Sequence, residues 1–263
     1  MSEKAPILKR KEYPILEYDS TRLAVIEPSK VIEKIDISEH CVICYFDDVI
    51  ANIVQTHNAK LVHVFKTAIG EHPIYEIEYH GKRVAFFHPF IGAPLAAGFL
   101  EEVIGFGCKK FIVCGGAGVL DSEIAVGHVV IPDRALRDEG TSYHYLPPAR
   151  TISASPEVVE IIESVLDQHN VSYVKGMTWT TDGFYRETPD KVKLRKEEGC
   201  IVVEMEAAAY FAVAEFRGVL LGQILYGGDD VGSEKWDSRD WYSKTSVREK
   251  LFWLAAESCI SIK

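Results

Sequence analysis

Four short clusters of acidic or glycine residues follow directly after apolar runs, and their residue types and spacing are the ones best suited to chemistry. Carboxylates can accept hydroxyl groups or transfer protons, and glycines let a backbone approach a ligand closely. In α/β proteins, ligands collect where strands end and loops begin. The clusters are Phe46-Asp47-Asp48, Cys114-Gly115-Gly116-Ala117-Gly118, Glu204-Met205-Glu206 and Gly227-Gly228-Asp229-Asp230.

The two later clusters carry paired carboxylates. Glu204 and Glu206 flank a methionine immediately after an apolar run. One glutamate at a strand-to-helix junction can simply favour the helix dipole. A second glutamate at such a junction is less common. A carboxylate there can accept hydrogen bonds from two vicinal hydroxyl groups, such as those of a sugar. Asp229 and Asp230 are either a solvated turn or, beside a pocket, the source of a general acid.

The glycine-rich cluster does not match the common phosphate-binding loops. Its spacing is neither Gly-x-Gly-x-x-Gly nor that of a Walker loop, so a dinucleotide or ATP is not favoured, and a tight turn is the alternative. The isolated His88 and His144 are either structural residues or ligand contacts. Because no residues have metal-ligand spacing, the sequence predicts no metal.

Composition favours a globular protein that binds a small molecule. The chain of 263 residues is 47% hydrophobic and 26% charged, with a formal net charge of −10. That charge argues against nucleic-acid binding, which needs a basic face, but leaves room for a local cationic pocket. No run approaches the roughly 20 apolar residues of a membrane span, and the N-terminus does not resemble a signal peptide. We therefore expect a cytoplasmic protein with no membrane partner.

Cysteine usage agrees with a reducing compartment. Six cysteines are spread over the chain, and Cys41-x-x-Cys44 lies inside a strand-like apolar run. Since no second Cys-x-x-Cys and no histidine motif accompanies this pair, it is interpreted as buried strand cysteines rather than a redox or zinc pair.

Apolar runs and helical spacing predict the elements that must position these clusters. Residues 155–169 have apolar positions at i, i+3, i+4 and i+7, and His80-Gly81 joins two strand patterns as a hairpin. The predicted strands are 41–46, 74–79, 82–87, 110–116, 127–132, 171–178, 200–203 and 219–228, and the predicted helices are 94–107, 155–169, 206–216 and 243–262.

Alternating strands and helices, with several strands apolar throughout, indicate an α/β fold whose central sheet is covered by helices on both faces. Residues 1–40 are polar and punctuated by proline, and we expect them to form an N-terminal arm. With no linker or repeat further along, residues 41–263 are predicted to form one domain.

From about residue 41 to the C-terminus, the chain resembles the nucleoside phosphorylase family. This family contains the hexameric purine nucleoside phosphorylases, the uridine phosphorylases and the methylthioadenosine-type nucleosidases. The resemblance implies a three-layer α/β/α sandwich with a mixed, partly barrel-like sheet, assembled as a homo-oligomer, either a dimer or a hexamer built as a trimer of dimers. It rests on GHVVIPDRALRDEGTSYHYLPP (127–148), TWTTDGFYRETPDKV (178–192), VVEMEAAAYFAVAEFRGV (202–219) and LYGGDDVGSEKW (225–236).

The resemblance also implies a role for several residues in cleaving the N-glycosidic bond of a nucleoside. Glu206 would bind the ribose hydroxyls, with Met205 packed on the sugar. Phe184 would stack on the base, and the backbone of Ala117 and Gly118 would line the base pocket. Asp229 would protonate or hydrogen-bond the base, with Asp230 as the alternate.

By the same resemblance, Asp229 favours a purine-like base, and two further positions lack the residues that read a pyrimidine. Uridine phosphorylases carry a glutamine and an arginine after the stacking phenylalanine, and these places fall on Thr188 and Asp190. The pyrimidine signature is therefore missing, although Arg186 and Glu187 could read a base in another way.

The expected phosphate site departs from the family pattern. The family's Gly-Asp-Pro-x-Arg loop is here Phe46-Asp47-Asp48-Val49-Ile50, and its Arg-Val-Gly-Ser/Thr motif is here Val113-Cys114-Gly115-Gly116. Both arginines are thus absent. Only Lys66 matches a phosphate-site cation, one that usually reaches a neighbouring subunit, and a surface lysine is an equal alternative.

Three interpretations remain open. The chain is first expected to be a phosphorylase of glycosyltransferase type, giving free base and ribose 1-phosphate, with phosphate as co-substrate and no other cofactor; Arg83, Arg137, Arg186 or Arg239 would then hold the phosphate. It could instead be a nucleosidase with Asp47 or Asp48 as base, although the nucleosidases have their water-activating glutamate where this chain has Ile50. The third alternative is a non-catalytic nucleoside-binding protein.

Overall fold

The computed structural model describes residues 8–263. Its strands are β1 (His40–Cys44), β2 (Lys60–Thr67), β3 (Gly70–Tyr79), β4 (Lys82–Phe87), β5 (Lys110–Val119), β6 (Val129–Asp138), β7 (Thr151–Ser153), β8 (Tyr173–Thr181), β9 (Cys200–Glu204) and β10 (Leu220–Asp230). Its α-helices are α1 (Pro28–Val31), α2 (Asp47–Thr56), α3 (Ala93–Phe106), α4 (Pro156–Gln168), α5 (Pro189–Glu197), α6 (Ala207–Arg217) and α7 (Thr245–Ser261), and its 3-10 turns are η1 (Pro14–Leu16), η2 (Thr141–His144), η3 (Phe184–Arg186) and η4 (Trp241–Ser243).

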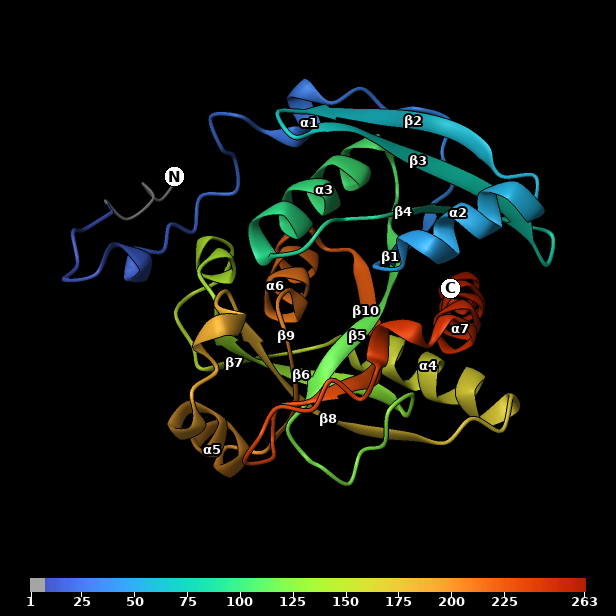
Figure 1. Cartoon of the computed structure of the whole chain (residues 1–263). Coiled ribbons are helices and arrows are strands. Elements are labelled where there is room, and N and C mark those ends of the chain that lie inside the picture. Colours follow the sequence, from blue (N-terminus) through green and yellow to red (C-terminus); the bar gives the residue numbers. More distant parts are fainter. Residues whose placement is uncertain (1–7) are drawn as a thin grey trace.

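The strands form one mixed sheet that partly closes on itself. Their order is β10-β6-β8-β9-β5-β1-β4-β3-β2, with β7 paired to β6. Strand β10 also pairs with β5, so that β10, β6, β8, β9 and β5 form a closed barrel of five strands. Strands β1, β4, β3 and β2 extend from this barrel as an open sheet (Figure 1). This is the mixed, partly barrel-like sheet that the family resemblance implied.

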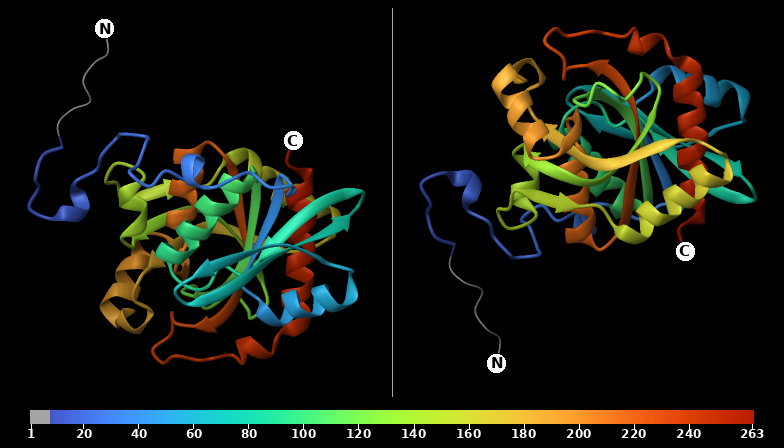
Figure 2. Two further views of the ribbon diagram at one scale, coloured as in Figure 1. Left: turned by 90° about the horizontal axis from the view of Figure 1, so that it is seen from above. Right: turned by 90° about the horizontal axis from the view of Figure 1, so that it is seen from below.

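Helices cover the sheet on more than one side (Figures 1 and 2). Helices α3 and α6 pack together on one side, and α4 packs against α7 on another. Helix α4 buries Val158, Ile162, Val165 and Leu166, which follow the helical spacing of the sequence, although Ser155 at its N-cap makes no side-chain hydrogen bond. No helix within residues 8–263 is long and apolar enough to cross a membrane.

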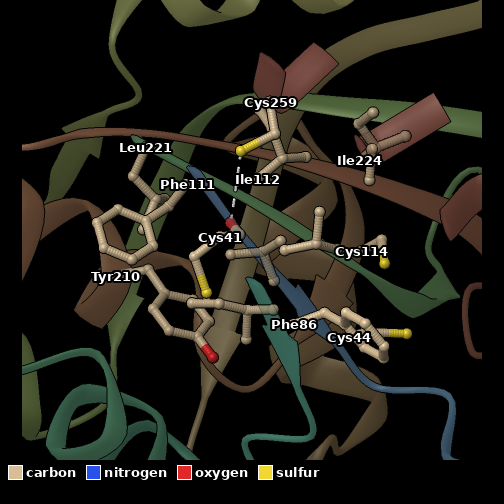
Figure 3. Packing of buried hydrophobic residues seen from close by; sticks show 14 of the residues in the cluster. Cys41, Cys44, Phe86, Phe111, Ile112, Cys114, Tyr210, Leu221, Ile224 and Cys259 are labelled. Atoms are coloured by element: carbon tan, nitrogen blue, oxygen red, sulfur yellow. Dashed lines mark hydrogen bonds between the residues drawn. The ribbon is translucent and has the colours of Figure 1, made fainter. Parts of the chain in front are cut away.

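Small and apolar side chains, including cysteines, fill the centre of the core (Figure 3). All six cysteines are free and buried, which confirms the interpretation of Cys41 and Cys44 as strand cysteines. Burial raises the pKa of the Cys41 thiol. The Cys259 thiol of α7 donates to the carbonyl oxygen of Cys41 at 3.6 Å, which fixes the C-terminal helix against β1.

Several contacts hold the N-terminal segment to the rest of the domain, and those of Arg217 are among them. Glu27, within this segment, is buried. Arg217, at the end of α6, donates to Glu27 at 2.9 Å and to Glu101 of α3 at 2.7 Å. The predicted arm, 1–40, remains a prediction as a unit, and its residues 1–7 lie outside the described part of the chain.

Candidate functional site

A cavity of about 620 Å³ opens at the ends of several strands, and all four clusters singled out in the sequence contribute to it. Because the strands β1, β5 and β10 run parallel, their carboxyl ends meet at the same edge. The cavity is lined by residues 45–48, His88, Ile91, residues 115–118 and 203–206, Gln223, Leu225, Gly228, Asp229, Trp241, Tyr242 and Arg248.

Glu206 lies at one end of this cavity, between β9 and α6. Its Oε1 accepts a hydrogen bond from the backbone N–H of Gly92 at 2.6 Å. Burial, reinforced by the negative charge of Glu204, raises the pKa of Glu206 to about 8. A carboxyl group held in this way can accept hydrogen bonds from hydroxyl groups and, when protonated, donate one to them.

Glu204 supports the start of α6. Its carboxylate accepts hydrogen bonds from the backbone N–H groups of Glu206 at 2.7 Å and Ala207 at 2.6 Å, and from the Thr180 hydroxyl at 2.6 Å. Burial raises its pKa despite these bonds, which act in the opposite direction. Both glutamates line the cavity, but Glu204 is engaged in holding the backbone at the start of α6.

Tyr45 is a cavity residue that the sequence did not single out. Its hydroxyl lies 2.9 Å from the hydroxyl of Tyr210, and both tyrosines have pKa values raised by burial, with the charge of Glu206 adding to the shift. Since Tyr45 directly follows β1, its position at a strand end is the signal that could have identified it.

Asp229 lies at another part of the cavity, at the end of β10. The indole N–H of Trp236 donates to its Oδ2 at 2.7 Å. Gly118 lies next to this carboxylate: a Cβ added at Gly118 would be 3.6 Å from Oδ1 of Asp229. The same Cβ would be only 2.9 Å from the side chain of Val203. The absence of a side chain at Gly118 thus lets the carboxylate lie against the backbone of β5.

Asp230 has a structural role in the same loop. It is buried, does not line the cavity, and accepts hydrogen bonds from the N–H groups of Gly232 and Ser233. It also pairs with Arg239 at 2.6 Å. Because Asp230 is fully engaged in holding this loop, Asp229 is the member of the pair that faces the cavity.

Two residues given site roles by the resemblance lie outside the cavity. Phe184 is 51% exposed in η3, where its ring packs on Tyr185 with centroids 4.1 Å apart. The side chain of Lys66 is 79% exposed and lies 3.8 Å from Glu71. In contrast, Met205, Ala117 and Gly118 line the cavity as expected.

The remaining part of the cavity, beside Asp47 and Asp48, corresponds to the altered phosphate motifs. Ile50 and Val113, which replace arginines, are buried in the core. A side chain at Gly116 would meet the Tyr226 ring at 3.2 Å. The missing hydroxyl position is therefore occupied by an aromatic ring from β10.

The arginines that the sequence offered in compensation do not line the cavity. Arg83 binds Glu76 and Asp36, and Arg239 binds Asp230. Arg137 donates to the carbonyl oxygen of Pro147 at 2.8 Å and to the hydroxyl of Ser142. Arg186 is exposed in η3.

The cation that does line the cavity is Arg248, from the first turn of α7. Its Nη1 lies 3.2 Å from both carboxylate oxygens of Asp48, and its Nη2 donates to the carbonyl oxygen of Tyr242. Its guanidinium lies 5.9 Å from the ring centroids of Phe46 and Trp241. The sequence predicted the helix but gave no sign that this face of it reaches the site.

Of the two histidines singled out in the sequence, one lies at the cavity and the other does not. His88 lines the cavity, where burial lowers its pKa, and its Nδ1 accepts the N–H of Phe90 at 3.1 Å. His144 lies in η2, away from the cavity. Within residues 8–263, no group of three or more His, Cys, Asp or Glu residues is arranged to hold a metal ion.

A barrel of five strands with a carboxylate-lined cavity at its strand ends defines the class of nucleoside phosphorylase-like α/β proteins. Residues 39–250 match the Phosphorylase superfamily, and the chain belongs to this family. It is accordingly an enzyme of the nucleoside phosphorylase type, a class that includes both phosphorylases and nucleosidases.

The relatives that this chain resembles are named for different substrates. The chain is 29% identical to the guanosine phosphorylase of Halorubrum lacusprofundi over 191 residues, which cover 69% of this chain and 78% of that protein. It is 30% identical to the uridine phosphorylase of Treponema pallidum over 146 residues, covering 51% of this chain and 57% of that protein. The match thus spans little more than half of the second relative.

Solved structures confirm the fold. The uridine phosphorylase of Vibrio fischeri ES114 superimposes with a TM-score of 0.74 at 22% identity, covering 90% of this chain and 99% of that one. The AMP nucleosidase of Bacteroides thetaiotaomicron gives a TM-score of 0.68 at 22% identity, covering 85% and 87%. The same fold therefore occurs in proteins named as phosphorylases and as nucleosidases.

Proposed function

We propose that this chain cleaves the N-glycosidic bond of a purine-like nucleoside and transfers the sugar to phosphate, giving free base and ribose 1-phosphate. The observation that carries the proposal is that one cavity brings together Asp229, Glu206 and Met205 with the backbone of Ala117 and Gly118. These residues supply a group for the leaving base, a group for the sugar, and a surface between them.

The two carboxyl groups act on opposite halves of the nucleoside. As the glycosidic bond breaks, positive charge develops on the ribose and electrons move into the base. Asp229 protonates or hydrogen-bonds the base nitrogen, and the Trp236 N–H holds one of its carboxylate oxygens in place. Glu206 binds the ribose hydroxyls, and Met205 packs on the sugar.

A purine-like base is supported by the residues around the base end. Thr188 and Asp190 stand where a uridine phosphorylase reads its base, and neither lines the cavity. The acidic Asp229 suits a base that accepts a proton on a ring nitrogen. The guanosine phosphorylase among the relatives agrees with this choice.

Water is the second candidate acceptor, and one observation favours it. Asp47 and Asp48 both line the nucleophile end, and the Arg248 there is already paired. A phosphate dianion would meet this negative charge, whereas a water molecule could lose its proton to Asp47. The chain would then be a nucleosidase.

We further propose a cytoplasmic homo-oligomer, a dimer or a trimer of dimers. Six free cysteines suit a reducing compartment. Lys66 is exposed on β2 and would reach the phosphate site of a neighbouring subunit. For Phe184 to stack on the base, η3 would have to turn its ring inward from the surface.

The test is release of free base from a panel of purine and pyrimidine nucleosides, followed by HPLC with and without phosphate. Phosphate-dependent release of a purine is the expected result, and phosphate-independent release would replace phosphorolysis by hydrolysis. Binding without release would indicate a non-catalytic protein. Asp229→Asn and the exposed Asp167→Asn form a matched pair, and only the first should lose activity.

A further inference from the structure

Arg248 has the features of an anion-binding group rather than of a surface arginine. Among the residues described, it is the only lysine or arginine that lines the cavity. Its side chain is 11% exposed, and its Nε forms no hydrogen bond within residues 8–263. Since a guanidinium stays charged and has five N–H donors, this group retains donors for a ligand.

The partner that Arg248 now has is easily displaced. The Asp48 side chain is 42% exposed. Both of its oxygens contact the same arginine nitrogen at 3.2 Å, instead of forming the parallel pair of bonds that a guanidinium and a carboxylate prefer. A pair with this geometry and exposure contributes little, and Asp48 can turn into solvent.

A helix N-terminus opens at the same place. Helix α2 begins at Asp47, and Phe46 at its N-cap provides no side-chain hydrogen bond to the first turn. The N–H groups of an uncapped first turn favour an anion, and the exposed Asp47 and Asp48 are the anionic groups that now stand beside them.

The surrounding residues have changed in a matching way. Tyr226 occupies the space beside Gly116 and donates from its hydroxyl to the Trp241 carbonyl oxygen at 3.1 Å. Burial raises the pKa of Tyr226, against the opposing effect of the nearby Arg248 charge. The family pattern carries positive charge at positions 50 and 113, whereas here the positive charge at the cavity comes from Arg248 of the C-terminal helix.

We infer that Arg248 and the N-terminus of α2 form the binding site for the phosphate co-substrate, with Asp48 as a resting counter-ion that phosphate displaces. The inference rests on the proposed function, because phosphate is the acceptor there. It names Arg248, a residue outside the family motif, as the cation of the anion site. It also assigns Asp48 a role opposite to that of a catalytic base, since this carboxylate competes with the anion.

The experiment is titration of the full chain with inorganic phosphate alone, by calorimetry, in wild type, Arg248→Met, Arg248→Lys and Asp48→Asn. We expect Arg248→Met to raise the phosphate Kd at least tenfold, Arg248→Lys to restore part of the affinity, and Asp48→Asn to lower the Kd severalfold. Nucleoside Kd should stay unchanged in all three variants. Opposite signs at the two positions distinguish competition for an anion from a pair that merely joins α2 to α7.

The outcomes separate this inference from the proposed function. Phosphate-dependent base release with an unchanged phosphate KM in Arg248→Met would overturn the inference and leave phosphorolysis intact. A wild type that binds no phosphate would also overturn it. Phosphate binding that depends on Arg248, together with base release in water alone, would support the anion site and refute phosphorolysis. If Arg248→Met does not fold, the comparison of Asp48→Asn with wild type decides.

Discussion

Glu206 makes a pH-dependent contribution to stability that can be removed by a single substitution. Its pKa is about 8 in the folded chain, against an ordinary value of 4.5. Between these values the folded state keeps a proton that the unfolded state has lost, so the stability falls as pH rises towards 8. The slope is at most about 1.4 kcal/mol per pH unit for one proton, which gives a loss of about 1–3 kcal/mol between pH 6 and 8.

Replacing Glu206 by glutamine removes this titration but keeps an oxygen that can accept the Gly92 N–H. We therefore expect the free energy of unfolding of Glu206→Gln, relative to that of wild type, to increase by about 1–3 kcal/mol as pH rises from 6 to 8. The same change should weaken ribonucleoside binding about 5- to 10-fold, because an amide in place of the carboxyl group changes the donors and acceptors that face the ribose hydroxyls.

The assay is urea unfolding at pH 6, 7 and 8, with Glu160→Gln, an exposed change on α4, as the control. The control should follow the wild-type pH dependence. Parallel curves for wild type and Glu206→Gln would refute the idea that Glu206 holds a proton in the folded chain. An unaltered nucleoside affinity would refute its sugar-binding role.

Three further predictions concern the other parts of the cavity. Asp229→Asn should lower base release at least 100-fold, measured by HPLC, with an unchanged melting temperature; undiminished release would exclude Asp229 as the acid. Trp236→Phe should lower kcat about 10-fold through loss of the 2.7 Å bond that orients Asp229, and an unchanged kcat would assign Trp236 only a covering role. Gly116→Ala should cost about 1–3 kcal/mol in chemical denaturation, because its Cβ would lie 3.2 Å from Tyr226, and a neutral change would show that the ring can move.

Much of the fold could be predicted because its strands are apolar and its turns are marked by glycine. The hairpin of β3 and β4 around His80-Gly81 and the buried strands β1, β5 and β10 agree with the predicted ranges within a few residues. Helix α2 was not predicted, since its opening Asp47-Asp48 was treated as part of a loop. Strand β2 was also missed, because it lies at an end of the sheet and most of its side chains are not buried.

The site was predictable to the extent that it depends on strand ends. Glu206 and Asp229 both line the cavity because each lies at the end of a strand, β9 and β10, and a strand end can be recognised from local patterns. Arg248 could not be predicted, because its place depends on packing between α7 and α2, 200 residues apart. Phe184 and Lys66 match the family motif, yet both side chains are exposed outside the cavity, because a motif does not fix the direction of a side chain.

The cavity draws its walls from both ends of the domain, from Tyr45 to Arg248. During synthesis, the chain that carries Glu206 and Asp229 therefore exists before the wall made by α7 does. A growing chain has no complete cavity until its last helix, anchored through Cys259 to β1, has left the ribosome. A ligand that binds only the finished cavity stabilises the whole folded domain. Only chains whose folding is complete therefore gain this stabilisation. Chains shortened at the C-terminus would lack it.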